Sequence, residues 1–164
     1  MKRISTVFLL IFNLTSFGQK AMDCDSNFTL ITKNGKLYGT LLQPHTDKKT
    51  PLAIIIAGSG PTDRDGNNPM MKNNSLKMLA ENLAQHGISS LRFDKRGIAA
   101  SKNAISSENE MRFEIGVNDV KEWIELMKKD KNFSSITLIG HSEGSLIGML
   151  ASQNIDKYIS VAGT

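Results

Sequence analysis

Residues 136–144 read ITLIGHSEG, and this stretch decides the fold class of the chain. Its first four residues, Ile136 to Ile139, have the pattern of a buried strand. Residues 142–153 continue with a pattern that predicts a helix. Between the two, Gly140 and Gly144 flank Ser142 in a Gly-x-Ser-x-Gly motif. In this context the glycines allow a very tight strand-to-helix turn that holds the serine strained, with its hydroxyl projecting. The alternative is that these residues simply cap a helix.

The turn predicts a nucleophile at Ser142, with Gly140, His141 and Gly144 forming the elbow around it. The helix N-terminus behind the serine favours negative charge. A hydrolase that forms a tetrahedral intermediate needs two backbone N–H groups aimed at one developing oxyanion. We expect one of them to be the amide of Glu143, the residue after the nucleophile.

A second glycine-rich segment, residues 57–67 (AGSGPTDRDGN), follows the apolar run 52–57. Its missing side chains let the backbone approach a substrate, so it is the expected source of the second N–H. Ser59 is the first choice and Gly60 the second; the alternative is an ordinary loop. Asp63 and Asp65 suggest calcium, but further oxygen ligands are not spaced to complete a site. Salt bridges from these aspartates to Arg64 or Arg96 are the expected arrangement.

Outward from these motifs the pattern alternates strands with helices. Asn34-Gly35 is a strong hairpin signal between two strand patterns, so the chain opens with an antiparallel pair. The later strands alternate with helices, which implies parallel pairing with right-handed crossovers. The predicted class is a three-layer α/β fold with a mostly parallel sheet behind an antiparallel hairpin. The expected strands are 27–32, 36–43, 52–57, 89–93, 136–139 and 158–161.

Two further helices are expected, each with recognisable end signals. The first is 76–85, with Ser75 as N-cap and Gly87 as its stop. The second is preceded by a possible capping box of Ser107 and Glu110, and Lys128 and Lys129 suit the negative end of its dipole. Its apolar stripe consists of Phe113, Val117, Val120, Ile124 and Met127.

The first 18 residues have the pattern of a secretory signal peptide, with a basic start, an apolar stretch and small residues before the expected cleavage after Gly18. The apolar run is too short for a membrane anchor. We therefore expect export to the periplasm or the exterior, with no stable membrane insertion after cleavage. The domain expected to remain is 19–164. Cys24, the single cysteine, is expected to carry neither a disulfide nor lipid.

Composition is that of an ordinary globular domain, with 40% hydrophobic and 22% charged residues. The net charge of +4 falls by two when Lys2 and Arg3 are removed with the signal peptide. So small and interspersed a surplus gives no electrostatic reason to expect nucleic acid or an anionic membrane as partner.

Three stretches together, GSGPTDRDGN (58–67), LRFDKRGIAAS (91–101) and IGHSEGS (139–145), resemble the α/β-hydrolase superfamily. The first is most similar to bacterial secreted EstD-type esterases, which are related to dienelactone hydrolase-like and serine peptidase-like members. The resemblance implies a carboxylic ester hydrolase with a small-molecule ester substrate, an acyl-enzyme on Ser142 and no metal or organic cofactor. Ala99 stands where the similar stretch usually carries glycine, a departure expected to stiffen the turn.

In this superfamily the catalytic order is Ser, then Asp or Glu, then His. After Ser142 this sequence has one acid, Asp156, and no histidine. We expect His45 to lie between the hairpin and the first buried strand, His86 to end a helix, and His141 to pack or bond to a loop carbonyl. None suits a general base.

We therefore interpret the chain as the N-terminal part of a hydrolase domain, inactive by itself, whose acid and histidine belong to a missing C-terminal part. Two other functions remain open. One is a secreted serine aminopeptidase or acyl-peptidase, and the other is a truncated, non-catalytic hydrolase-like binding domain.

Overall fold

The computed structural model describes residues 24–105 and 112–163, so the expected signal peptide, Ser107 and Glu110 lie outside the described part. One six-stranded sheet runs through the molecule in the order β1-β2-β4-β3-β5-β6. Its strands are β1 (Cys24–Thr32), β2 (Gly35–Gln43), β3 (Thr50–Ile56), β4 (Ser89–Phe93), β5 (Phe133–His141) and β6 (Lys157–Val161). The helices are α1 (Ser75–Gln85), α2 (Phe113–Lys128) and α3 (Glu143–Ala151), with a 3₁₀ helix, η1 (Ala99–Ala104).

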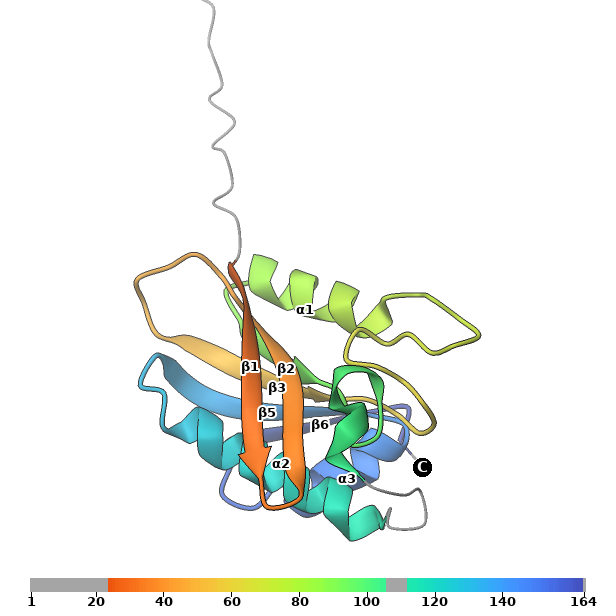
Figure 1. Ribbon diagram of the computed structural model, residues 1–164. Helices are drawn as coiled ribbons and strands as arrows, with labels where there is room; N and C mark the ends of the chain where they lie inside the picture. The colour runs from red at the N-terminus through yellow and green to blue at the C-terminus, as the bar shows by residue number, and fades with distance from the viewer. Residues whose placement is uncertain (1–23, 106–111, 164) are drawn as a thin grey trace, which may run out of the picture.

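The predicted hairpin is confirmed. β1 and β2 pair antiparallel from Cys24 opposite Gln43 to Thr32 opposite Gly35. Gly35 has φ +129°, a conformation that L side chains rarely adopt, which explains the glycine at this turn. β2 then pairs antiparallel with β4, so the hairpin forms one edge of the sheet (Figure 1).

The rest of the sheet is parallel. β3 lies between β4 and β5, and β6 pairs parallel with β5. Residues 52–56 are all buried because β3 is covered on both faces. The three-layer α/β class predicted from the sequence is therefore confirmed. β1 begins three residues before the predicted start, and β5 extends three residues further at its start and two at its end.

Helices cover both faces of the sheet, α1 on one and α2 and α3 on the other (Figure 1), and each face has its own apolar core. On one face α1 packs on the side chains of Ala53 and Ile55 from β3. On the other, α2 and α3 pack on Ile54 and Ile56, which alternate with them along the strand. Trp123 of α2 is fully buried there and its ring centroid lies 5.6 Å from that of Phe93.

The start of α1 differs from the expected cap. The cap position is Asn74, with φ 52°, and Ser75 is the first helical residue instead. The Asn73 side-chain oxygen accepts a hydrogen bond from Ser75 N–H at 2.9 Å, and the backbone carbonyl of Asp65 accepts hydrogen bonds from the N–H groups of Leu76 (3.1 Å) and Lys77 (3.3 Å). A loop residue distant in sequence therefore supplies the hydrogen-bond acceptor that the sequence pattern assigned to the Ser75 side chain. Gly87, with φ +77°, follows the end of the helix as expected.

A buried ion pair connects the hairpin turn to α2. The Arg96 guanidinium donates to both carboxylate oxygens of Asp119, at 2.9 and 2.7 Å. It also donates to the Ala104 carbonyl at 2.7 Å, and to Thr32 Oγ1 at 2.8 Å. Burial raises the pKa of Asp119, and the hydrogen bonds and charge of Arg96 oppose that rise. One arginine therefore holds together β1, η1 and α2.

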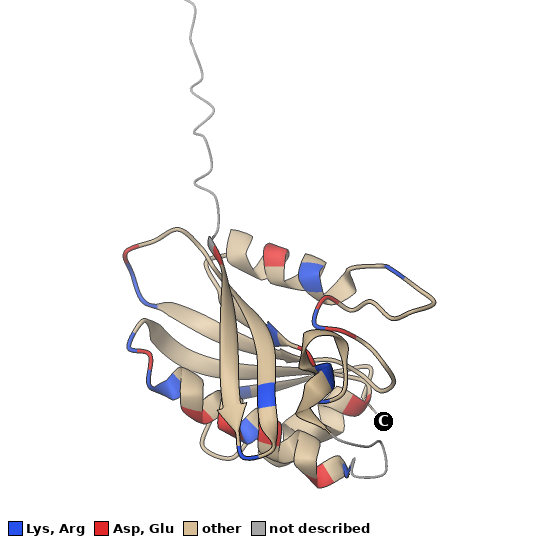
Figure 2. Cartoon of the chain, in the orientation of Figure 1, with Lys and Arg blue, Asp and Glu red and all other residues tan. Residues whose placement is uncertain are grey.

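The charged residues lie mainly on the helices and connecting loops, with both signs interspersed (Figure 2). In the described part of the chain, the helices all fall short of the length and apolar character that crossing a bilayer requires.

Candidate active site

Ser142 sits at the sharp turn between β5 and α3, with φ 52° and ψ −124°. A non-glycine residue pays about 1–3 kcal/mol for such a conformation, which persists only where its surroundings fix it. Two backbone hydrogen bonds do so here: Ser142 N–H donates to the Val161 carbonyl at 2.9 Å, and Ser145 N–H donates to the Ser142 carbonyl at 2.8 Å. The strained strand-to-helix turn predicted from the motif is therefore present in the structure.

The two motif glycines are required by close backbone approach. A Cβ atom on Gly140 would lie 2.6 Å from the carbonyl carbon of Gly144 and from the Cα of Ser145. A Cβ atom on Gly144 would lie 2.6 Å from the carbonyl oxygen of Ala57. The first glycine lets the chain fold back on itself, and the second lets α3 start directly against the end of β3.

Replacing Gly140 with alanine is expected to lower the free energy of unfolding by about 3 kcal/mol, because backbone atoms must move to admit the methyl group. Gly116→Ala is the matched control. Its Cβ would lie 3.4 Å from Ile147 Cδ1 inside a helix, where alanine is favoured over glycine by about 0.5–1 kcal/mol. Denaturant unfolding of both variants measures the difference. Equal stability of the two variants would contradict the packing described for the turn.

The glycine-rich loop after β3 lies beside the serine. A Cβ atom on Gly58 would lie 3.2 Å from Ser142 Cβ and 3.2 Å from His141 Nδ1. Across residues 24–105 and 112–163, no acceptor pairs with the backbone N–H of Ser59, Gly60 or Glu143. These are the three amides proposed from the sequence as oxyanion donors. The fold therefore brings Ser142 and the N–H groups of the two candidate donor segments, which have no acceptor among the described residues, to the same edge of the sheet.

Lys95 holds this loop from the side of β4. Its ammonium donates hydrogen bonds to the carbonyl oxygens of Gly58 and of Gly60, the latter at 2.9 Å. Burial lowers the pKa of Lys95, and the nearby charge of Glu143 opposes that shift. Sequence reasoning did not single out this lysine, because nothing in its local pattern indicates which backbone it reaches.

The loop also folds on its own side chains, although not through the salt bridges expected for it. Asp63 Oδ1 accepts hydrogen bonds from the N–H groups of Asp65 (2.9 Å) and Asn67 (2.8 Å). Asp65 pairs with the buried Arg92 of β4. Arg64 pairs instead with Asp94 at 2.7 Å.

The expected pairing of these aspartates with Arg64 or Arg96 was therefore wrong. Arg64 pairs with Asp94, which directly follows β4, and Arg96 pairs with Asp119 of α2. In the described ranges no group of three His, Cys, Asp or Glu side chains is placed to hold a metal ion.

The turn after β4 contains the departure noted at Ala99. This residue has φ 44°, in the left-handed region that favours glycine. The neighbouring Ala100 N–H donates to Asp94 Oδ2 at 3.1 Å, the same carboxylate that holds Arg64. Asp94 thus fixes the conformation of both the glycine-rich loop and this turn.

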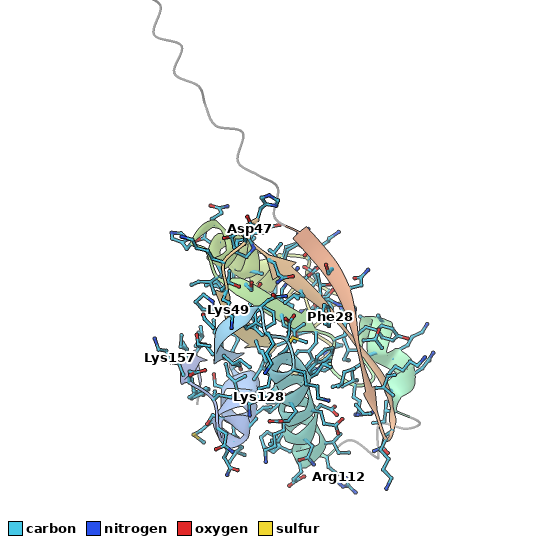
Figure 3. The ribbon with its side chains drawn as sticks, turned by 90° about the vertical axis from the view of Figure 1, so that its left-hand side faces the viewer. Phe28, Asp47, Lys49, Arg112, Lys128 and Lys157 are labelled. Carbon is cyan, nitrogen blue, oxygen red and sulfur yellow. The ribbon has the colours of Figure 1, made fainter. Side chains whose placement is uncertain are left out.

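A pocket of about 330 Å³ opens beside the candidate donors. Gly60, Lys95 and Glu143 line it on the side of the loop and the elbow. Arg112 also lines it and marks the N-terminal end of α2 (Figure 3). The remaining lining is mainly apolar and includes Ile56, Phe93, Ile98, Phe113, Val120 and Ile147.

The three histidines do not form a base for Ser142 among the described residues. His45 is exposed in the loop before β3, and His86 caps α1, with its ring 2.8 Å from the Asn82 carbonyl. The His141 ring is exposed beside Gly58 and, in the part of the chain described, forms no hydrogen bond to a loop carbonyl. Asp156 lies elsewhere, where its carboxylate accepts from the Ile136 N–H at 2.7 Å.

Comparison with known proteins places this geometry in a family. The model of Hydrolase_4, described as serine aminopeptidase, S33, matches residues 72–162, more than half of the chain. The chain belongs to the Hydrolase_4 family. This match and the solved relatives below confirm the α/β-hydrolase superfamily and fold predicted from the sequence.

Among relatives of this Hydrolase_4 chain, Esterase EstD of Thermotoga maritima is 29% identical over 119 residues, which cover 71% of the chain and 27% of EstD. The α/β hydrolase GrgF from Penicillium sp. sh18 superposes with a TM-score of 0.70 at 23% identity, over 85% of the chain and 46% of GrgF. Est1E from Butyrivibrio proteoclasticus, solved with ferulic acid bound, gives a TM-score of 0.63 at 25% identity, over 76% of the chain and 46% of Est1E. The chain thus spans about a quarter of EstD and just under half of each solved hydrolase.

Proposed function

We propose that the protein containing this Hydrolase_4 chain is a serine hydrolase that cleaves carboxylic esters through an acyl-enzyme on Ser142. The observation that carries the proposal is the conformation of Ser142, strained at φ 52°, close to the amides of Ser59 and Glu143, which have no acceptor among the residues that the structure describes. Backbone strain of this kind is retained at functional sites. The adjacent N–H groups are the donors that a tetrahedral oxyanion needs.

The pocket supports an apolar acyl or aryl group as the part of the substrate that is bound. Its lining is mainly apolar, with Phe93 and Phe113 among the larger side chains. EstD is an esterase, and Est1E binds ferulic acid, an aromatic carboxylic acid. Short or medium acyl esters and aryl esters are therefore the proposed substrates.

Proton transfer from the Ser142 hydroxyl needs a base within hydrogen-bonding reach. In this proposal a histidine and its acid partner come from the rest of the hydrolase domain, of which the chain spans just under half in GrgF and Est1E. Experiments on activity accordingly use the intact gene product that carries these residues.

A serine aminopeptidase or acyl-peptidase is the second candidate, because the matching family is described as serine aminopeptidase, S33. The same acyl-enzyme chemistry serves both, and the leaving group distinguishes them. A panel of p-nitrophenyl esters and aminoacyl p-nitroanilides separates the two, since an esterase turns over the first set with the higher kcat/KM.

Labelling by a fluorophosphonate tests the nucleophile directly. The probe reacts with activated serines, so it is expected to modify Ser142 in the folded intact protein and to fail with the urea-unfolded protein. Peptide mapping by mass spectrometry locates the modified residue, and Ser142→Ala is expected to abolish labelling. Modification of another serine, with Ser142 unmodified, would overturn the assignment. A folded protein with no labelled serine would favour the non-catalytic binding domain.

A further inference from the structure

The carbonyl oxygens held by Lys95 belong to the loop that supplies a candidate oxyanion donor. Lys95 reaches across from the end of β4 to Gly58 and Gly60, two residues that flank Ser59. The Ser59 amide itself has no acceptor among the described residues. The direction of this N–H must therefore be fixed through the rest of its peptide group.

The peptide group between Gly58 and Ser59 links the direction of this N–H to Lys95. The carbonyl of Gly58 and the N–H of Ser59 belong to one planar peptide group, which is trans here, so the two bonds point in opposite directions. A hydrogen bond that fixes the Gly58 carbonyl therefore fixes the Ser59 N–H as well. An ammonium on the carbonyl oxygen also polarises the amide and strengthens the N–H as a donor.

The same geometric argument applies to the two peptide groups that follow, Ser59–Gly60 and Gly60–Pro61. The carbonyl of Ser59, which shares its peptide plane with the Gly60 N–H, accepts a hydrogen bond from Thr62 Oγ1 at 3.1 Å. The second carbonyl held by Lys95, that of Gly60, precedes Pro61, which has no N–H. That second bond therefore anchors the loop without orienting a donor. Of the two peptide groups that Lys95 holds, only the one between Gly58 and Ser59 carries an N–H donor.

Lys95 is itself rigidly placed. Asp94 before it binds Arg64 at 2.7 Å, and Arg96 after it binds Asp119 at 2.7 Å. Both side chains are buried, so the backbone on each side of Lys95 is fixed to a different element. Holding the lysine side chain in one conformation still costs side-chain entropy, but the backbone from which it extends is already fixed.

We propose that Lys95 is a positioning residue for the oxyanion hole, which orients and polarises the Ser59 N–H through the Gly58 carbonyl. The inference rests on the proposed hydrolase function. It assigns the donor role to Ser59 rather than Gly60.

The test compares Lys95→Met with Lys77→Met in the intact gene product. Lys77 is an exposed lysine on α1 that pairs with Glu81 at 3.9 Å. Losing a well-oriented oxyanion donor typically lowers kcat by about 100-fold or more. We expect a loss of about that size in kcat for Lys95→Met on a p-nitrophenyl ester, with KM changed by less than about threefold, and no change for Lys77→Met. A kcat within about threefold of wild type would overturn the proposal.

A second measurement separates orientation of the donor from general damage to the fold. An aryl trifluoromethyl ketone adds to an active serine as a tetrahedral oxyanion, so its affinity reports the oxyanion hole. Lys95→Met is expected to lower the affinity for the ketone by about the same factor as it lowers kcat/KM, because both depend on the same N–H donor. A weakened kcat/KM with unchanged ketone affinity would contradict the role.

Hydrogen exchange keeps this inference distinct from the proposed function. In Lys95→Met the amides of residues 58–60 are expected to exchange faster than in wild type, while Lys77→Met leaves them unchanged. Wild-type protein that shows no Ser142-dependent turnover would overturn the proposed function, and the positioning role with it. Unchanged exchange in Lys95→Met would overturn the inference even if Ser142 proves to be the nucleophile.

Discussion

Replacing Ser142 with alanine is expected to lower kcat of the intact gene product on an ester by about 10⁶-fold, the loss seen when a serine nucleophile is removed from a comparable site. The methyl group cannot attack the ester, so no acyl-enzyme forms. KM is expected to change little, because the pocket and the donor amides are untouched. Initial rates on a p-nitrophenyl ester, corrected for spontaneous hydrolysis, measure the effect.

Ser152→Ala provides the control for this substitution. Ser152 follows α3, is part-exposed and donates its hydroxyl to the Met149 carbonyl at 2.7 Å. This variant is expected to keep wild-type turnover. Activity of Ser142→Ala within about tenfold of wild type would show that another group performs the attack and would remove the basis of the proposed mechanism.

Replacing Arg96 with methionine is expected to lower the free energy of unfolding by about 3–5 kcal/mol, the usual cost of leaving a buried charge without its partner. Asp119 is only 5% exposed, and Arg96 supplies both of the side-chain hydrogen bonds that its carboxylate accepts within the described residues. The variant also leaves the Ala104 carbonyl without its 2.7 Å donor. Urea unfolding at neutral pH measures the loss.

The pH dependence of that loss identifies Asp119 as its source. Burial raises the pKa of Asp119 above its ordinary value of 3.8, and without Arg96 the rise is larger. A carboxyl with a raised pKa in the folded state destabilises the fold as pH rises from the unfolded value through the folded one. The variant is therefore expected to lose less stability near pH 4 than at pH 7.

Two further variants complete this experiment. Lys128→Met removes an exposed pair with Glu125, worth about 0.5 kcal/mol or less, and serves as the control. Asp119→Leu added to Arg96→Met removes the uncompensated charge and is expected to restore part of the stability. A loss below about 1 kcal/mol in Arg96→Met, or one independent of pH, would contradict the structural role assigned to the pair.

The sequence predicted features whose physical cause is local. Asn34-Gly35 specified the hairpin because only glycine readily adopts φ +129°. The run 52–56 specified a central strand because every residue in it is apolar and buried. The elbow at Ser142 could be predicted for the same reason. The atoms that a side chain on either motif glycine would meet lie within a few residues or at the end of the adjacent strand.

Features that depend on distant partners could not be predicted in the same way. Ser75 looked like a helix cap, yet the Asp65 carbonyl accepts the hydrogen bonds of the Leu76 and Lys77 N–H groups. Asp63 and Asp65 were expected to pair with Arg64 or Arg96, but Arg64 pairs with Asp94 and Arg96 pairs with Asp119 of α2. Lys95 gave no signal, because its acceptors are backbone carbonyls more than 30 residues away.

The location of the elbow has a consequence for the order of folding. Gly144 fits only against the end of β3, and the Ser142 N–H bonds to Val161 of β6. β3 and β5, which pair from Thr50 to Ile56, come from segments about 80 residues apart. Contacts between such distant segments form slowly, because a long loop must close first. We therefore expect the hairpin to form early and Ser142 to reach its strained geometry among the last steps, so that a nascent chain does not present the Ser142 hydroxyl in this conformation until its sheet is assembled.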